Sequence, residues 1–521
     1  MKLANYLGGR WVEGGGEGRA LVDPVLGTEL ARATTEGIDF AAALAYAREI
    51  GGPALRGLTF AERAAMLVKV ADVLTANRDA YGEIALANSG NTKPDAAIDI
   101  DGAIGTIRYY ARAAQPLGAA RALRDGGLIR MGRDEGFQAL HVGVALRGVA
   151  IHINAFNFPA WGLWEKAAVA LLAGVPVLAK PATATCWLAQ RMVEDVIKAG
   201  AVPDGALSIA CGGAGDLLDH VDPSDAVAFT GSAETARSIR NHRRVVAAST
   251  RVNIEADSLN ACLLGPDAAP GSAEFDLLVA EVSREMTVKA GQKCTAIRRV
   301  LAPQSVADAL SQAIAARLAA VKVGNPRNEA VRMGPLVDKA QQRAAGDGIA
   351  ALSREARVVF DGGAGFAPID ADASRAAFVA PTLLACPEPG AGRVVHEVEV
   401  FGPVSTVMPY RNADEAFALA RRGQGSLVAS VFSGDAAFLE RAALELAESH
   451  GRVLALDAAT AKGSTGHGIV MPMCKHGGPG RAGGGDELGG LGALWFYHQR
   501  SALQGPAERL KAIAESAGST A

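Results

Sequence analysis

The feature that most constrains this fold is an alternation of apolar segments with helical patterns. Apolar runs at residues 149–153, 175–179, 206–210 and 225–229 are predicted to be buried strands. The first run is followed by a helical pattern over 162–173, and Gly174 stands where that helix should end. Strands that alternate with helices at this spacing form parallel sheets. We therefore expect an α/β protein with a doubly wound sheet, whose ligands bind at the carboxyl ends of the strands.

Length and composition are those of a multidomain globular protein. A chain of 521 residues predicts two or three domains, and 52 basic against 55 acidic residues give no sign of a nucleic-acid partner. We find neither a signal-peptide pattern nor an apolar run long enough for a membrane, and expect a cytoplasmic protein without a membrane partner. Neither the six cysteines nor the nine histidines have metal-site spacing, so we expect reduced thiols and no metal.

Three further elements can be predicted. Apolar residues alternate on either side of a charged turn at 133–136, which predicts a β-hairpin over 126–147. The aromatic run 493–498 is expected to be a strand late in the chain. A helix is predicted over 275–289, and it leads directly to Cys294.

Cys294 and Glu255 are candidates for the two halves of an aldehyde oxidation. A thiolate at Cys294, which follows Gly291-Gln292-Lys293, could add to an aldehyde, and loss of hydride would leave a thioester. Glu255, at the end of a predicted strand, could activate the water that hydrolyses this thioester. Each residue alone also permits a simpler interpretation, as a buried thiol or as a surface carboxylate.

Asn157 is a candidate donor to the oxyanion that forms during such a reaction. Its amide and the backbone N–H of Cys294 would supply two donors. The alternative is an asparagine that only shapes the turn before Pro159.

Four segments in the same order, 153–159, 253–257, 291–294 and 399–404, resemble the motifs of the aldehyde dehydrogenase superfamily. The resemblance covers nearly the whole chain and implies the roles given above to Cys294, Glu255 and Asn157. Where the family has Glu-Leu-Gly-Gly-Lys, this chain keeps the glutamate and has Ala-Asp-Ser-Leu after it. The resemblance implies a Rossmann-type cofactor domain (1–125 and 148–259), an α/β catalytic domain (260–486) and small β oligomerisation elements (126–147 and 487–521).

The same resemblance implies where a cofactor binds. Lys180 corresponds to the lysine that contacts the adenosine ribose, and Thr183 stands where many NAD-preferring members have a glutamate. A hydroxyl can donate to a 2′-phosphate and Lys180 supplies positive charge, so we predict NADP, with NAD as the second choice. Gly231 and Ser232 open a predicted helix and suit a pyrophosphate. The other expected cofactor contacts are Ile153, Asn154, Gly213, Phe229, Glu399 and Phe401.

Residues 476–490 resemble the dehydrogenase part of ring-cleavage enzymes that act on aromatic CoA thioesters. This implies a CoA-linked substrate, 3,4-dehydroadipyl-CoA semialdehyde of benzoate breakdown, or alternatively 3-oxo-5,6-dehydrosuberyl-CoA semialdehyde. Because only residues 491–521 follow, we expect no second catalytic domain, which favours the first. The segment could also simply be a loop around the site.

Two other classes of protein are alternatives to a dehydrogenase that releases a free acid. An enzyme that passes the acyl group to CoA does not need an acid that activates water, so Glu255 makes this class less suitable. The presence of both Cys294 and Asn157 disfavours a non-catalytic relative. The resemblance finally implies a homo-oligomer, with a dimer favoured.

Overall fold

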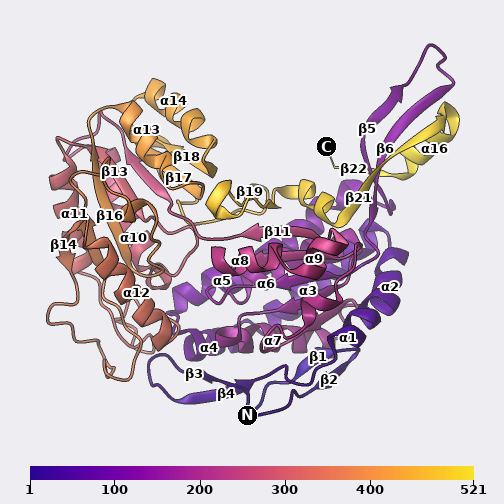
Figure 1. Cartoon of the computed structure of the whole chain (residues 1–521), viewed down its shortest axis with the longest axis horizontal. Coiled ribbons are helices and arrows are strands. Elements are labelled where there is room, and N and C mark those ends of the chain that lie inside the picture. The colour runs from indigo at the N-terminus through magenta and orange to yellow at the C-terminus, as the bar shows by residue number, and fades with distance from the viewer. Residues whose placement is uncertain (521) are drawn as a thin grey trace.

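Two seven-stranded sheets form the body of the chain, in a computed structural model that describes residues 1–520 (Figure 1). The first sheet has the order β11-β10-β7-β8-β9-β1-β2. Its strands from β11 to β9 are parallel, and β1 and β2 add an antiparallel edge. These strands are β1 (Asn5–Leu7), β2 (Arg10–Val12), β7 (Ala150–Ile153), β8 (Val177–Lys180), β9 (Leu207–Ile209), β10 (Ala226–Thr230) and β11 (Arg251–Glu255).

The strand order places a topological switch point between β7 and β10. The chain runs from β7 through α6 (Trp161–Ala173) to β8 and through α7 (Cys186–Lys198) to β9, and then returns to the other side of β7 as β10. Ligands in such sheets bind beyond the carboxyl ends of the strands at the switch point. The predicted α/β fold is confirmed, and Gly174 ends α6 in the left-handed conformation, with φ of 90°.

Helices cover both faces of the first sheet. Apolar side chains of α3, α5, α6 and α7 form one core, and those of α1, α8 and α9 form another against the opposite face. The helices not yet given are α1 (Phe40–Tyr46), α2 (Gly52–Gly57), α3 (Phe60–Ala76), α4 (Arg78–Ser89), α5 (Lys93–Ala113), α8 (Ala233–Arg240) and α9 (Arg243–Ala248).

The second sheet has the order β14-β15-β16-β13-β12-β17-β18 and is parallel except for β14. Helices α10 and α11 pack into one of its cores, and α12, α13 and α14 into the other. Its strands are β12 (Ala261–Leu264), β13 (Arg299–Pro303), β14 (Arg357–Asp361), β15 (Thr382–Ala385), β16 (Val404–Tyr410), β17 (Ser426–Phe432) and β18 (His450–Leu456). Its helices are α10 (Ala273–Thr287), α11 (Ala307–Ala319), α12 (Lys339–Leu352), α13 (Ala413–Arg421), α14 (Ala436–Ala447) and α15 (Ala458–Ala461).

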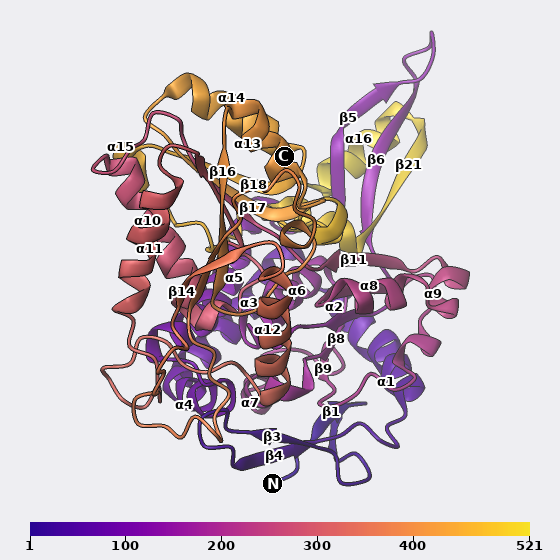
Figure 2. The same ribbon diagram turned by 60° about the vertical axis from the view of Figure 1, so that its left-hand side comes forward.

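The predicted hairpin is present as β5 (Leu123–Arg130) and β6 (Phe137–Ala145). It projects from the body of the molecule with α16 (Ala507–Ser516) beside it, as Figures 1 and 2 show. The strands β21 (His498–Pro506) and β22 (Gly518–Ser519) complete a four-stranded sheet in the order β21-β6-β5-β22. A separate two-stranded sheet joins β3 (Arg19–Val22) to β4 (Glu29–Ala33).

The prediction of a strand over 493–498 is wrong. Residues Gly490–Tyr497 form a 3₁₀ helix, and the strand β21 begins only at His498. Leu494 and Tyr497 are both buried, and a spacing of three residues puts them on one face of a 3₁₀ helix. Gly489 and Gly490, both with positive φ, turn the backbone into this helix.

The glycine-rich segment before this helix covers the free edge of β11. The Ala256 N–H donates to Ala482 O at 2.9 Å, and the Gly485 N–H donates to Ile254 O at 3.1 Å. Gly483 has φ of 109°, and a Cβ there would lie 2.3 Å from Ile254 O, so a side chain is excluded. The segment connects two short paired strands, β19 (Lys475–His476) before it and β20 (Glu487–Leu488) after it. Figure 1 shows β19 between the two large sheets.

No helix within residues 1–520 is both long and apolar enough to cross a membrane. The assignment of the three regions as cofactor, catalytic and oligomerisation domains stays a prediction.

Candidate active site

The carboxyl ends of β7, β8, β10 and β11 open into one cavity of about 480 Å³. Loops of the second sheet close its other side, so that residues far apart in the chain share one wall. The candidate residues that line this cavity are Ile153, Asn154, Asn157, Lys180, Phe229, Gly231, Ser232, Glu255, Cys294, Glu399 and Phe401. The structure thus brings together all three candidate catalytic residues and most of the candidate cofactor residues.

Thr183 and Gly213 lie apart from the others. They line a wide neighbouring pocket, together with Arg19 of β3. The hydroxyl of Thr183 donates to Gly212 O at 2.9 Å, so it is already used within the protein. Burial, together with the nearby charge of Arg19, lowers the pKa of Lys180. Arg19 is a cation that sequence reasoning did not assign to this region.

The loop that carries Cys294 is held in place by close backbone packing and by side chains that donate hydrogen bonds to backbone carbonyls. Gly291 has φ of 68°, and a Cβ there would lie 2.2 Å from Gly402 O. Arg298 donates to Gly291 O at 2.9 Å and to Gly402 O at 2.7 Å, and Asn260 donates to Cys294 O at 2.8 Å. These contacts fix the position of the Cys294 thiol. Burial, and after it the charge of Glu255, raises the pKa of the Cys294 thiol.

Glu255 is the last residue of β11 and is buried, with 2 % of its surface exposed. The residues after it differ from the family pattern but have structural roles here. The Ala256 N–H pairs with the C-terminal segment, and Asp257 Oδ1 accepts the Ala233 N–H at the start of α8 at 2.9 Å. The departure from the Gly-Gly pattern therefore leaves the glutamate facing Cys294.

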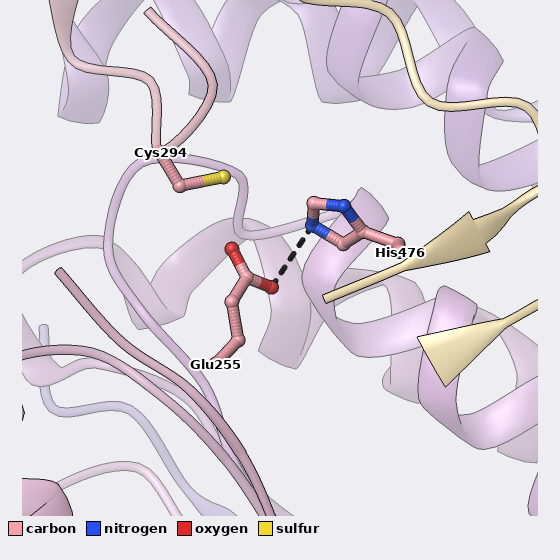
Figure 3. Close-up of side chains that lie close together, drawn as sticks. All are labelled: Glu255, Cys294 and His476. Atoms are coloured by element: carbon pink, nitrogen blue, oxygen red, sulfur yellow. Dashed lines mark ion pairs between the residues drawn. The ribbon is translucent and has the colours of Figure 1, made fainter. Parts of the chain in front are cut away.

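His476 of β19 is the partner of Glu255 (Figure 3). Its Nε2 lies 3.0 Å from Glu255 Oε2, and both side chains are almost fully buried. One atom each of Cys294, Glu255 and His476 lie within 4.8 Å of one another. Sequence reasoning missed this histidine as a site residue, although it opens the segment 476–490, whose resemblance to ring-cleavage enzymes implies the CoA-linked substrate.

A buried ammonium group lies next to this cluster. Lys166 Nζ contacts Glu165 Oε1 at 2.8 Å and Glu487 Oε2 at 2.9 Å. Burial raises the pKa of Glu487 to about 7, against the charge of Lys166. One carboxylate oxygen each of Glu165, Glu255 and Glu487 lie within 4.8 Å of one another. The sequence signal for the contact between Glu165 and Lys166 is that two charged residues are adjacent inside an otherwise apolar helix. Buried charges require partners.

Glu399 and Phe401 come from a loop of the second sheet and line the larger cavity. Glu399 Oε2 accepts the Ser258 N–H at 2.9 Å, and Oε1 lies 3.5 Å from Arg298 Nε. Burial raises the pKa of Glu399 to about 7, although Arg298 opposes the shift. The Phe401 ring packs edge-on against Phe156, with ring centroids 5.6 Å apart.

A second, narrow pocket of about 40 Å³ meets the first at Cys294. Asn157, Glu255 and Cys294 line both spaces, while Phe158, Trp161 and other mainly apolar groups line only the narrow one. His476 and Glu165 also border the narrow pocket. The thiol can thus be reached from two sides, one wide enough for a large ligand and one suited to a slim chain.

The larger cavity has the properties of a dinucleotide site. Its volume is within the usual range of about 300–1,000 Å³ for ligand pockets. Among the described residues, the side-chain amide atoms of Asn154 and the hydroxyl of Thr230 are buried without a hydrogen-bond partner, and both residues line the cavity. The start of α8 also forms part of its wall, and helix N-termini favour phosphate groups.

Comparison with known proteins gives the class. Residues 11–499 match the model of the aldehyde dehydrogenase family, and the chain belongs to this family, as the motifs predicted. The chain is 60 % identical over 479 residues to the 3,4-dehydroadipyl-CoA semialdehyde dehydrogenase of Aromatoleum evansii, which covers 92 % of this chain and 93 % of the relative.

More distant proteins support the same class. The non-phosphorylating aspartate-semialdehyde dehydrogenase of Halomonas elongata is 30 % identical over 437 residues, covering 82 % of this chain and 83 % of the relative. The crystal structure of betaine aldehyde dehydrogenase from Staphylococcus aureus in complex with NAD+ has a TM-score of 0.82 at 24 % identity, covering 96 % of this chain and 94 % of that one. The last comparison shows the shared fold.

Proposed function

We propose that this chain oxidises 3,4-dehydroadipyl-CoA semialdehyde to 3,4-dehydroadipyl-CoA with NADP, in the aerobic breakdown of benzoate. The observation that carries this proposal is the 60 % identity, over 92 % of the chain, to an enzyme named for that substrate. The grouping of Cys294, Glu255 and Asn157 where two cavities meet supports the chemistry.

Acylation begins at Cys294. Its thiol proton passes to Glu255, and the sulfur forms a bond to the aldehyde carbon while the carbonyl electron pair moves to oxygen. The Asn157 amide and the Cys294 N–H are the proposed donors to this oxyanion. As the carbonyl re-forms, the C–H electron pair leaves as hydride, and a thioester to Cys294 remains. NADP, when bound, supplies the acceptor for this hydride.

Deacylation depends on Glu255. After release of the proton it took up, the carboxylate accepts a proton from water, whose oxygen adds to the thioester carbon. The C–S bond then breaks, the sulfur recovers a proton, and the carboxylic acid leaves. One oxygen of Glu255 lies within 4.8 Å of the Cys294 sulfur, so the carboxylate can activate a water next to the thioester. This supports water, and not CoA, as the acceptor of the acyl group.

The cofactor would occupy the larger cavity. Lys180 is the proposed partner of the adenosine ribose, Gly231 and Ser232 of the pyrophosphate, and Glu399 and Phe401 of the nicotinamide riboside. The preference for NADP rests on the absence of a carboxylate at Thr183 and on the nearby cations Lys180 and Arg19. The cations carry more weight than the Thr183 hydroxyl, because that hydroxyl already donates to Gly212 O.

The assembly is proposed to be a homodimer. Four large apolar side chains on the projecting hairpin are between 43 % and 49 % exposed, which suits burial against a second copy. These are Ile129, Met131, Phe137 and Val144. Light scattering behind a sizing column would show twice the mass of the chain, and a monomer or a tetramer would contradict the proposal.

A panel of aldehydes tests the activity. Semialdehydes of matched chain length, with and without a CoA thioester, are assayed with NADP and with NAD, and Cys294→Ala provides the blank. We expect the highest kcat/KM for the CoA-linked six-carbon semialdehyde with NADP. Equal rates for simple aliphatic aldehydes, a higher rate with the eight-carbon oxo-semialdehyde, or formation of a new CoA thioester would each contradict the proposal.

A further inference from the structure

The carboxylate of Glu255 has two different neighbours. Its Oε2 is paired with His476 Nε2 at 3.0 Å, and the other oxygen, Oε1, lies on the side of the Cys294 thiol (Figure 3). The side chains of His476 and Glu255 are only 4 % and 3 % exposed. The imidazole therefore holds one oxygen and leaves the other free to accept a proton.

A buried carboxylate tends to bind a proton, because burial disfavours its charge. Here burial is outweighed by the charge and hydrogen bond of His476 and by the charge of Lys166, and the pKa of Glu255 is lowered to about 2. The same contact raises the pKa of His476 although burial acts in the opposite direction. The two groups thus favour the ion-paired form.

We infer that His476 is a positioning residue for the water-activating base: it keeps Glu255 ionised and directs the free carboxylate oxygen at Cys294. The inference rests on the proposed function of Glu255, since a base must be ionised before it can accept a proton. His476 acts through Glu255, because its Nε2 contacts the Glu255 carboxylate.

The other charged groups around Glu255 do not replace this histidine. Lys166 of α6 already contacts Glu165 and Glu487 at 2.8 and 2.9 Å, so one ammonium group faces three carboxylates. Burial and the charge of Glu255 raise the pKa of the Cys294 thiol, which offers no positive charge to Glu255. Without His476, the excess of negative charge would make Glu255 take up a proton at a higher pH.

Two substitutions separate the charge of His476 from its hydrogen bond. His476→Phe removes both while keeping a ring of similar size, and His476→Gln keeps a donor without a charge. The readout is the pH dependence of steady-state kcat with the CoA-linked semialdehyde and NADP. His450→Phe, at a buried histidine of β18 bonded to Leu446 O, is the matched control.

The acid limb of the profile should move to higher pH in His476→Phe, by at least one unit. Rate is then lost as pH falls through the raised pKa of Glu255, and the deficit against wild type grows about tenfold for each pH unit below it. His476→Gln should shift the limb less, because its amide still bonds to the carboxylate. His450→Phe should leave the limb in place, and KM for NADP should be unchanged in all variants.

An acid limb at the wild-type position in both His476 variants would overturn the inference, as would an equal loss at every pH. Failure of the proposed function has a different signature. If Glu255→Gln turns over at the wild-type rate, Glu255 is not the base, whatever the His476 variants do.

Discussion

Replacing Lys166 is expected to lower the stability of the fold by an amount that can be worked out from its contacts. Its ammonium group is buried in α6 and contacts Glu165 and Glu487, which come from different parts of the fold. Lys166→Met keeps the length and apolar stem of the side chain and removes its charge. Two buried carboxylates then lose their shared partner, and breaking such a contact costs about 3–5 kcal/mol.

Protonation sets an upper limit on this loss. A stranded carboxylate can take up a proton, at about 1.4 kcal/mol for each pH unit above the pKa that it has in the wild-type protein. Glu487 already has a pKa of about 7 beside Lys166, so its share of this limit is about 1.4 kcal/mol at pH 8 and almost nothing at pH 6. Because a raised folded-state pKa gives stability that is lost as pH rises, the defect of the variant should be larger at pH 8.

Urea unfolding followed by tryptophan fluorescence measures the defect at both pH values. The matched control is Lys198→Met, on the surface of α7, where the side chain is 64 % exposed and its ammonium group lies 2.6 Å from Glu194 Oε1. An exposed pair of this kind contributes about 0.3–0.5 kcal/mol. Equal urea midpoints for the two variants at pH 8, or a Lys166 defect that grows as pH falls, would refute the reasoning.

Three shorter predictions concern the site itself. Cys294→Ala should abolish NADPH formation, measured at 340 nm, and keep cofactor binding, measured by fluorescence titration; residual turnover would exclude the thiol as nucleophile. Thr183→Glu should raise the NAD to NADP ratio of kcat/KM at least about tenfold, since a carboxylate repels the 2′-phosphate; an unchanged ratio would show that Thr183 does not face it. Gly291→Ala should slow alkylation of Cys294 at least about tenfold, because its Cβ would meet Gly402 O at 2.2 Å; Gly271→Ala, which also has positive φ but open space around it, should not.

Much of the fold could be predicted because its signals are local. Alternating apolar runs and helical patterns predict the four parallel strands β7 to β10 of the first sheet, and the charged turn at 133–136 predicts the hairpin. Sequence alone predicts a strand over 493–498, although its apolar and aromatic residues suit either a strand or a buried helical turn. Burial of Leu494 and Tyr497, which depends on distant parts of the chain, decides for the 3₁₀ helix.

The candidate site divides in the same way. Cys294, Glu255 and Asn157 stand in recognisable motifs, and the structure brings them together. The contact of Glu255 with His476 could not be predicted, because it requires the C-terminal segment to run along the edge of β11. No local pattern states which strand edge a distant glycine-rich segment will cover.

The most direct test of the account is the fate of the acyl group in Glu255→Gln. The variant is mixed with the CoA-linked semialdehyde and NADP, quenched within one turnover time, and examined by mass spectrometry while NADPH is followed. We expect about one NADPH for each chain, an acyl group bound to Cys294, and then little further turnover, because loss of a general base typically slows a step about 10²–10⁴-fold. Continued NADPH formation at the wild-type rate, or NADPH formation with Cys294 unmodified, would contradict it.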